Sequence, residues 1–340
     1  MTYFEPTVLL LVDSAKGTGP VEELLAHSGV PFATLDLLRA ARAEAPVWFQ
    51  AKNGAGCVVG FQDARDSRWT TTGRVLSVWA EDGQIGSDPV AHFQGANDDR
   101  AILRTLGLAE SWLMAAHIRG FLAERFLFLP QVIERQRLTY PPYPLATARD
   151  VGFKIPPTVV GQVLSALYKR GPVEKMHYRP LAAVKFQVRD TQFVTVERWI
   201  QADRSFAMHQ AFGPAVFSLR PDTGTRVLVL MLGGELFAIE LSLVDPCLDA
   251  QITDVSFHAA KKNLKITVCS LAGRMRDLCQ AFFRETGLQY GLIDLLHDPE
   301  SGDLWYLATN GSPKLSLFQE AGLPVYERLI EWLRRGNEAS

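Results

Sequence analysis

Apolar residues in the first eighty positions form short runs separated by polar turns. Thr7–Val12 is a continuous apolar run, Pro20–His27 resembles a short helix that begins with a proline, and Pro31–Leu37 has the pattern of a second strand. A strand, a helix and a strand in this order predict a parallel α/β sheet. Gly56–Gly60 and Val75–Trp79 are further strand candidates.

The middle of the chain changes to a helical pattern and then to a proline-rich segment. From Ala101 to about Leu129 apolar residues recur at helical spacing, and Pro130 ends the run. Thr139–Pro144 contains three prolines in four positions, a pattern that we expect to preclude both a helix and a central strand. We therefore predict a linker at residues 139–145, after an N-terminal α/β domain of residues 1–138.

Two strong local patterns follow in the last third of the chain. Arg226–Leu232 and Glu235–Leu241 alternate around Gly233-Gly234, which predicts a β-hairpin with a tight turn. Leu271–Glu285 has apolar residues at spacings of three and four, and Gly287 follows as the expected C-cap. These elements predict an antiparallel sheet covered by a helix.

A second hairpin carries the most informative polar residues. Gln289–Leu296 and Leu304–Asn310 are strand-like, and the turn residues between them set Asp294 opposite Ala308 if the turn is centred near Ser301. The two-residue period of a strand brings Asn310 to the same face as Asp294. Oxygen ligands of this kind suit magnesium, which takes one or two carboxylates and completes its shell with phosphates and water.

The motif Tyr-Gly-x-Ile-Asp ending at Asp294, a turn, Leu-x-x-Asn ending at Asn310, and Gly-Leu-Pro at Gly322 together resemble the C-terminal signature of the ATP-grasp superfamily. The likeness is greatest to graspetide (microviridin-type) and RimK-like peptide ligases. It implies an ATP-grasp fold, with a central lobe at residues 146–220, a C-terminal lobe at residues 221–335, and an α/β pre-ATP-grasp domain before them. The overall class is α/β with α+β lobes.

The resemblance also implies residue roles. Asp294 and Asn310 would hold magnesium on the ATP phosphates, although Ala308 stands where the family carries a second acid, a Glu. Arg179, in Tyr-Arg-Pro-Leu, would replace the lysine that contacts the phosphates, because arginine also binds phosphate through a charged fork. Arg226 would stabilise the acyl phosphate and is the catalytic candidate. Glu300, Glu235 or another acid could replace the missing ligand.

The implied activity is ATP-dependent formation of an amide or ester bond on a peptide or small protein, as in peptide (RiPP) maturation. The alternative is a degenerate pseudoenzyme that binds a peptide or a partner, such as a paralogous ATP-grasp subunit or a second copy. Taken one at a time, Asp294 could be a solvated strand residue, Asn310 ordinary turn chemistry, and the two arginines surface charges.

Composition excludes some classes of partner. The chain has 340 residues, 47% of them hydrophobic, with 35 basic and 37 acidic residues, so it has no overall field that favours nucleic acid or an anionic membrane. Its four cysteines form no C-x-x-C pair, its seven histidines show no paired ligand spacing, and no apolar run is long enough to span a bilayer. We expect a cytoplasmic protein.

Overall fold

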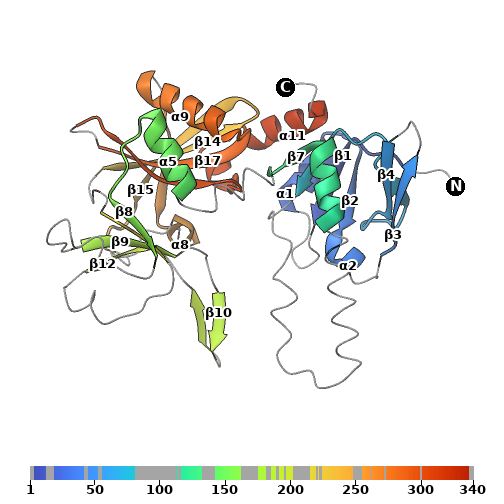
Figure 1. Cartoon of the computed structure of the whole chain (residues 1–340), viewed down its shortest axis with the longest axis horizontal. Coiled ribbons are helices and arrows are strands. Elements are labelled where there is room, and N and C mark those ends of the chain that lie inside the picture. The colour runs from blue at the N-terminus through green and yellow to red at the C-terminus, as the bar shows by residue number, and fades with distance from the viewer. Residues whose placement is uncertain are drawn as a thin grey trace. The chain divides into compact units, whose positions relative to one another are not determined.

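The computed structural model consists of two compact units, residues 1–135 with 324–340 and residues 136–323 (Figure 1). The described residues are 4–12, 19–41, 45–52, 56–80, 113, 116–131, 142–161, 175–180, 185–188, 191–194, 197–201, 215–219, 221, 224–247, 255–260, 262–271, 273–298 and 301–336. No helix within these ranges is both long enough and apolar enough to cross a membrane.

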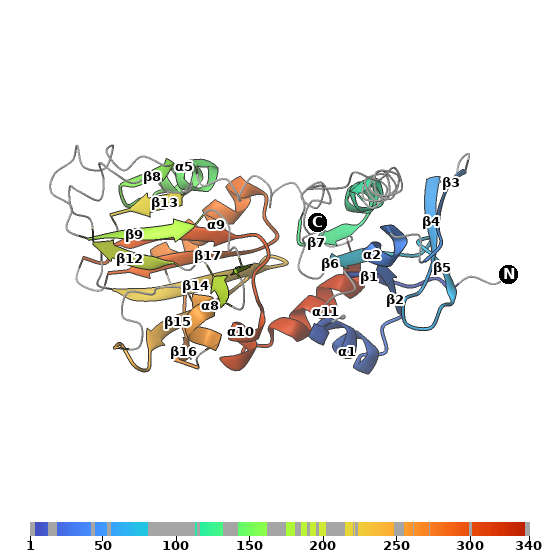
Figure 2. The ribbon, with the colours of Figure 1, turned by 90° about the horizontal axis from the view of Figure 1, so that it is seen from below.

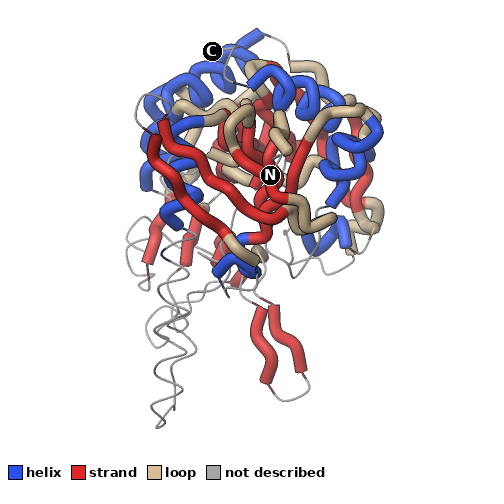
Figure 3. The backbone as a smooth tube through the Cα atoms, turned by 90° about the vertical axis from the view of Figure 1, so that its right-hand side faces the viewer, coloured by secondary structure: helices blue, strands red, loops and turns tan. Residues whose placement is uncertain are grey.

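The first unit contains the predicted parallel sheet, with strand order β2-β1-β6-β7. Both β2 and β6 pair in parallel with β1, and β7 pairs in parallel with β6, so the predicted parallel α/β sheet is confirmed. A separate antiparallel sheet, β3-β4-β5, belongs to the same unit (Figure 3). The elements are β1 (Val8–Val12), α1 (Gly19–His27), β2 (Phe32–Asp36), α2 (Leu37–Ala41), β3 (Val47–Lys52), β4 (Gly56–Gln62), β5 (Trp69–Thr71), β6 (Ser77–Ala80) and β7 (Leu127–Leu129).

The end of the predicted helix is wrong. Residues 116–125 are helical, but Leu127–Leu129 is a buried strand, β7, that extends the parallel sheet beside β6. A three-residue apolar run fits a helix and a buried strand equally well, so periodicity could not separate the two. Residues 101–112 lie outside the described part of the chain.

The proline-rich segment also differs from the prediction. Helix α5 (Pro142–Val151) begins inside it, with Pro142 and Pro144 in its first turn. Proline is compatible with the first turn of a helix, because the N–H groups there have no intrahelical acceptor. The segment therefore starts a helix, which the prediction had excluded.

The last helix, α11 (Val325–Arg335), packs with the first unit, against α1 and β6. The Ser77 hydroxyl donates a hydrogen bond of 2.6 Å to the carbonyl of Leu333. The sequence analysis placed residues up to 335 in the C-terminal lobe, whereas residues from Pro324 onwards group with the first unit.

The second unit is built on two antiparallel sheets that face each other (Figure 2). One has strand order β16-β15-β14-β17-β18 and the other β12-β9-β13-β8. The strands are β8 (Thr158–Gly161), β9 (Lys175–Pro180), β10 (Lys185–Val188), β11 (Thr191–Val194), β12 (Arg198–Gln201), β13 (Ala215–Ser218), β14 (Thr225–Leu232), β15 (Glu235–Leu243), β16 (Leu264–Val268), β17 (Tyr290–His297) and β18 (Leu304–Asn310). The remaining helices are α8 (Val255–Ala260), α9 (Gly273–Thr286) and α10 (Ser316–Glu320).

The glycine-pair hairpin has the predicted register. Leu232 pairs with Glu235 and Arg226 pairs with Leu241, so Gly233 and Gly234 form the two-residue loop. Their φ angles are 57° and 91°, in the left-handed region that glycine adopts without strain and that a tight hairpin turn needs. This turn fixes which residues of β14 share a face.

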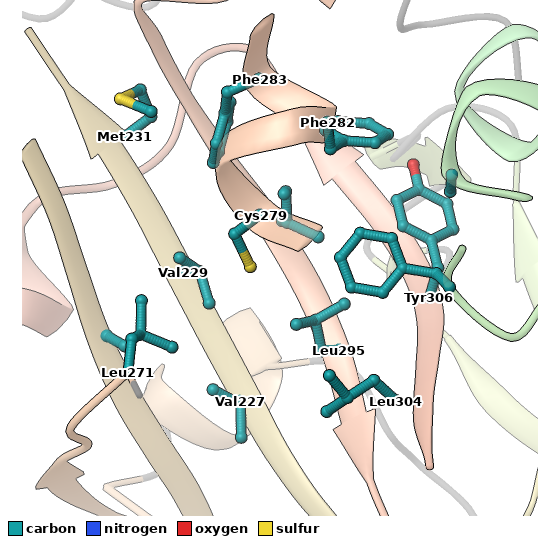
Figure 4. Packing of buried hydrophobic residues seen from close by; sticks show 14 of the residues in the cluster. Val227, Val229, Met231, Leu271, Cys279, Phe282, Phe283, Leu295, Leu304 and Tyr306 are labelled. Carbon is teal, nitrogen blue, oxygen red and sulfur yellow. The ribbon is translucent and has the colours of Figure 1, made fainter. Parts of the chain in front are cut away.

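The core of the second unit lies between α9 and the five-stranded sheet (Figure 4). Phe282 is fully buried there, and its ring contacts Phe153, Phe283 and Tyr306 at centroid distances of 5.6–6.4 Å. Cys279 on the same helix is also fully buried, as its spacing predicted. Helix and sheet therefore form one rigid support for the residues on the opposite face of the sheet.

Buried Cys279 makes the stability of this core sensitive to high pH. Burial raises the pKa of its thiol from 9.0 to about 12, so between these values the unfolded chain loses a proton that the folded chain keeps. The free energy of unfolding should then fall by about 1 kcal/mol from about pH 8 to about pH 10 because of this group alone. Urea titrations at several pH values should show that the free energy of unfolding falls more steeply with pH in wild type than in Cys279→Ala. Substitution of the exposed Cys247 by alanine should leave the slope unchanged, and equal slopes for wild type and Cys279→Ala would contradict the assignment.

Candidate active site

Strand alternation aims Arg226 and Asp294 away from the core. On β14, Val227 and Val229 pack under α9, and on β17 Ile293 and Leu295 do the same. Because side chains alternate along a strand, Arg226 and Asp294 share the opposite face of the sheet. The two strands are paired, with Leu228 opposite Asp294, so the arginine lies one diagonal position from the acid.

The second hairpin confirms the predicted pairing and adds a bulge. Asp294 pairs with Ala308, while Leu295 pairs with Tyr306, so Leu307 is the extra residue of β18. The bulge lets Tyr306 join the core beside Leu295 although Ala308 shares the face of Asp294. The methyl group opposite Asp294 offers no ligand atom.

The opposing sheet supplies the other wall of a cleft. His177 and Arg179 alternate along β9, and Ser218 on β13 pairs with His177 on one side and with Thr158 of β8 on the other. Together with Asp294 they line a cleft that is open to solvent. The lining residues are Leu145, Pro156, Thr158, His177, Arg179, Glu197, Val216, Ser218, Asp294, Leu307 and Ala308.

Arg226 and Asp294 form a two-pronged ion pair at the edge of this cleft. The arginine Nε donates to Asp294 Oδ1 at 2.9 Å, and its Nη2 donates to Oδ2. The side chains are only 18% and 10% exposed, so the pair is largely desolvated. Bidentate pairs of this kind are the strong form of a charged hydrogen bond, but each partner depends on the other to offset its desolvation.

Two further polar residues of the opposing sheet extend this pair. Glu197 Oε2 lies 3.8 Å from Arg226 Nη2 and 3.9 Å from His177 Nε2. The His177 ring, 4% exposed, also packs edge-on against Trp199 at 5.6 Å. The chain of contacts from His177 through Glu197 and Arg226 to Asp294 therefore connects the two walls of the cleft.

Arg179 is the second cation of the cleft. Among the described residues no acidic side chain forms an ion pair with it, unlike Arg226. Its charge is close enough to act on Tyr306, where burial raises the pKa of the phenol while the Thr309 hydrogen bond and the Arg179 charge oppose the rise. Arg179 is thus available to an anionic group that enters the cleft.

Asn310 is placed differently from the other predicted site residues. It pairs with Leu292 on the face expected from the register, but it is exposed, and its Oδ1 accepts the N–H of Ser312 at 2.8 Å. This is the local turn chemistry that asparagine commonly supplies. The structure brings Arg179 and Asp294 into one cleft beside Arg226, and does not place Asn310 among the lining residues.

The donor atoms present do not form a metal site on their own. No group of three His, Cys, Asp or Glu side chains within the described ranges could hold an ion. Asp294 is the one carboxylate on this face of the hairpin, it is already neutralised by Arg226, and Ala308 lies opposite. The donor set does not fit two ions. It fits a single magnesium that shares Asp294 with phosphate oxygens, the arrangement that magnesium commonly adopts.

Sequence reasoning missed Glu197 and His177. The histidines showed no motif spacing, and Glu197 gains its position from the register of β12 with β9, where Tyr178 pairs with Arg198. Of the acids considered as replacement ligands, Glu300 lies outside the described residues and Glu235 is exposed at the hairpin end of β15. Besides Asp294, the acidic residue that lines the cleft among the described residues is Glu197.

No protein-family model matches the chain, and no curated protein matches its sequence. Solved structures do match over nearly the whole length. A RiPP-associated ATP-grasp ligase from Chryseobacterium gregarium, in complex with ADP and a leader and core peptide, has a TM-score of 0.74 at 13% identity and covers 96% of both chains. The macrocyclase MdnC from Microcystis aeruginosa, bound with precursor peptide MdnA, has a TM-score of 0.70 at 16% identity over 96% of this chain and 99% of its own.

A more distant match extends the likeness beyond peptide ligases. The VanG D-Ala:D-Ser ligase from Enterococcus faecalis has a TM-score of 0.55 at 9% identity, over 97% of this chain and 98% of its own. The predicted fold class is therefore confirmed: the chain has the ATP-grasp fold, and its structure is similar to those of ATP-grasp ligases that act in peptide modification.

Proposed function

We propose that this protein binds a nucleoside triphosphate in the Asp294 cleft and uses it to activate a carboxylate of a peptide substrate. The observation that carries the proposal is a cleft between two sheets that Arg179 and Asp294 both line, with Arg226 paired to Asp294. Two fixed cations and an acid suit phosphoryl transfer, in which positioning and charge neutralisation supply most of the catalysis.

The chemistry needs two steps. In the first, a carboxylate oxygen of the substrate attacks the γ-phosphorus of ATP, the bond from that phosphorus to the β–γ bridging oxygen breaks, and ADP leaves. In the second, an amine or hydroxyl attacks the acyl carbon, loses its proton and expels phosphate, which gives an amide or an ester. Arg179 binds phosphate oxygens, and Arg226 holds the transferred group and neutralises charge that develops on it.

Magnesium would supply further positive charge to the phosphates. Asp294 is the residue proposed to hold it, with phosphate oxygens as the remaining ligands. Asn310 stays a proposed second ligand, since its Oδ1 accepts the Ser312 N–H through one lone pair and has a second. ATP and a single magnesium are thus the cofactors that we propose.

A peptide substrate is supported by what the similar structures contain. The ligase from Chryseobacterium gregarium holds a leader and core peptide, and MdnC is bound with its precursor peptide. We propose a precursor peptide or small protein of the same general kind here, modified in the cytoplasm. We also propose a second copy or an intact paralogous ligase as a partner, on the basis of the resemblance.

Nucleotide binding is the first test. Mg-ATP at about 100 times its dissociation constant should stabilise the protein by about 2.7 kcal/mol, because it binds only the folded state. The rise in Tm should be several degrees, and Asp294→Asn should reduce it strongly. Asp303→Asn is the matched control, since Asp303 lies in the same hairpin but pairs with Lys154 outside the cleft. The absence of any shift at millimolar Mg-ATP would refute the proposal.

A second candidate function is a pseudoenzyme that binds a peptide or partner subunit without turning over nucleotide. The closed Arg226–Asp294 pair and the methyl group of Ala308 favour it, because together they leave too few carboxylate oxygens for a two-ion site. The candidates differ in whether an acyl phosphate forms. Hydroxylamine traps such an intermediate as a hydroxamate when the protein is incubated with Mg-ATP and a peptide that carries glutamate side chains. Nucleotide binding without hydroxamate would favour the pseudoenzyme.

A further inference from the structure

We infer that the cleft binds the phosphate groups of its nucleotide without a divalent cation, through the Arg179 guanidinium and the Ser218 hydroxyl. The inference deepens the proposed function and rests on it for the identity of the ligand. It limits the proposed magnesium to the transfer step, so that the affinity for the nucleotide does not depend on the ion.

Arg179 and Ser218 supply the two donors. Arg179 lies two residues from His177 on β9, and Ser218 pairs with His177 from the neighbouring strand β13. Since alternate residues of a strand share a face, the guanidinium and the hydroxyl are diagonal neighbours on the wall that both line. In the described part of the chain, no hydrogen bond or ion pair occupies either group. A phosphate group that enters the cleft can therefore accept hydrogen bonds from both.

The neighbouring hydroxyl of Thr158 is not equivalent to that of Ser218. Thr158 donates to the Pro156 carbonyl at 2.7 Å, so its proton is already used and it offers an anion only lone pairs. Ser218 is 8% exposed, which limits the access of competing water to its hydroxyl. Ser218 is thus the neutral donor of this wall, and Arg179 is the charged one.

The carboxylate on the facing wall is neutralised by the protein itself. Asp294 accepts hydrogen bonds from Arg226 on both of its oxygens, and Ala308, opposite it on β18, has no charge. Glu197 lies 3.8 Å from the same guanidinium, so two arginines balance the two acids of the cleft among the described residues. An unpaired carboxylate would repel a phosphate group unless a cation lay between them. With Arg226 in that place, the phosphates need no ion to offset Asp294.

A magnesium ion carried by the nucleotide adds few contacts with the protein. Magnesium usually takes most of its ligands from phosphate oxygens and water, and no group of three His, Cys, Asp or Glu side chains in the described ranges could hold it. The ion can lower the charge of the transferred phosphoryl group without fixing the nucleotide to the cleft.

Calorimetric titration with ADP tests the inference in two buffers, one with excess magnesium and one with EDTA. We expect the two dissociation constants to agree within about fivefold, the factor that one ordinary hydrogen bond contributes. Inorganic tripolyphosphate, which has no base or sugar, should compete with ADP in EDTA. A larger loss of affinity in EDTA would overturn the inference and leave the proposed function standing. A protein that binds ADP in neither buffer would refute the proposed function as well.

Variants of the two donors identify the groups that bind the phosphates in EDTA. Arg179→Gln should weaken ADP binding by about tenfold or more, and Ser218→Ala by about threefold, because charged hydrogen bonds are the stronger ones. Arg179→Lys should restore part of the affinity, since it keeps the charge. Arg149→Gln is the matched control, because Arg149 is exposed on α5 and pairs with Asp150. Wild-type affinity in Arg179→Gln would count against the inference. If Arg179→Gln does not fold, the comparison of the two buffers with wild type still decides.

Asp294→Asn separates a structural role of this acid from a magnesium-dependent one. The substitution removes the two-pronged acceptor that fixes Arg226, so it should weaken ADP binding by the same factor in both buffers. Asp303→Asn, in the same hairpin, should change neither constant. A loss confined to the magnesium buffer would show that Asp294 binds the nucleotide through an ion, which is the opposite of what we infer.

Discussion

Replacement of Phe282 by alanine should lower the free energy of unfolding of the second unit by about 3–5 kcal/mol, the largest loss that we expect from any single core change. Phe282 has no exposed surface, and its ring contacts those of Phe283 on α9, Phe153 just after α5, and Tyr306 on β18. Removal of the ring leaves a cavity that the surrounding side chains fill only in part.

Urea denaturation followed by circular dichroism measures the loss of stability. Leu243→Ala on β15 is the matched control, because its side chain is 37% exposed and should cost less than about 1 kcal/mol. A cost below about 1 kcal/mol for Phe282→Ala would show that the helix does not support the sheet as described. Nucleotide binding should weaken along with stability, since the opposite face of the same sheet carries Arg226 and Asp294.

Replacement of Arg226 by alanine should reduce the rate of acyl phosphate formation by about 10²–10³-fold, the usual effect of removing one preorganised charge from an active site. It also leaves Asp294 as a largely buried carboxylate without its two-pronged partner. Arg226→Lys should recover only part of the rate, because an ammonium group keeps the charge and loses the fork.

Hydroxamate formation from Mg-ATP and a glutamate-containing peptide measures this rate. Arg149→Ala is a suitable control, since Arg149 is 70% exposed and pairs with the neighbouring Asp150 on α5. A rate within about threefold of wild type in Arg226→Ala would remove Arg226 from the catalytic role, whatever its contribution to stability.

Local patterns determined how much could be predicted from the sequence. The parallel pairing of β1 with β2 across one helix, the Gly233-Gly234 hairpin and the Asp294–Ala308 pairing each depend on periodicity or turn chemistry between neighbouring elements. Those are the signals that a single sequence carries. The prediction that the proline-rich segment is not helical was wrong, because proline is compatible with the first turn of a helix although not with its interior.

The cleft itself was beyond local inference. Arg226 and Asp294 are 68 positions apart, and the sequence assigned them separate tasks, one on the acyl phosphate and one on magnesium. Their direct pairing follows from strand order in the sheet, which no local pattern encodes. Glu197 was missed for the same reason, since its approach to Arg226 requires the second sheet to face the first.

The extra residue Leu307 divides β18 into two stretches whose corresponding side chains face opposite sides of the sheet. Towards the turn, Leu304 and Tyr306 belong to the interior under α9, and beyond the bulge Ala308 belongs to the ligand side. Packing limits which substitutions the interior half tolerates, and the ligand of the cleft limits which substitutions the other half tolerates. The side chain at position 308 can therefore be changed without disturbing the aromatic cluster around Tyr306.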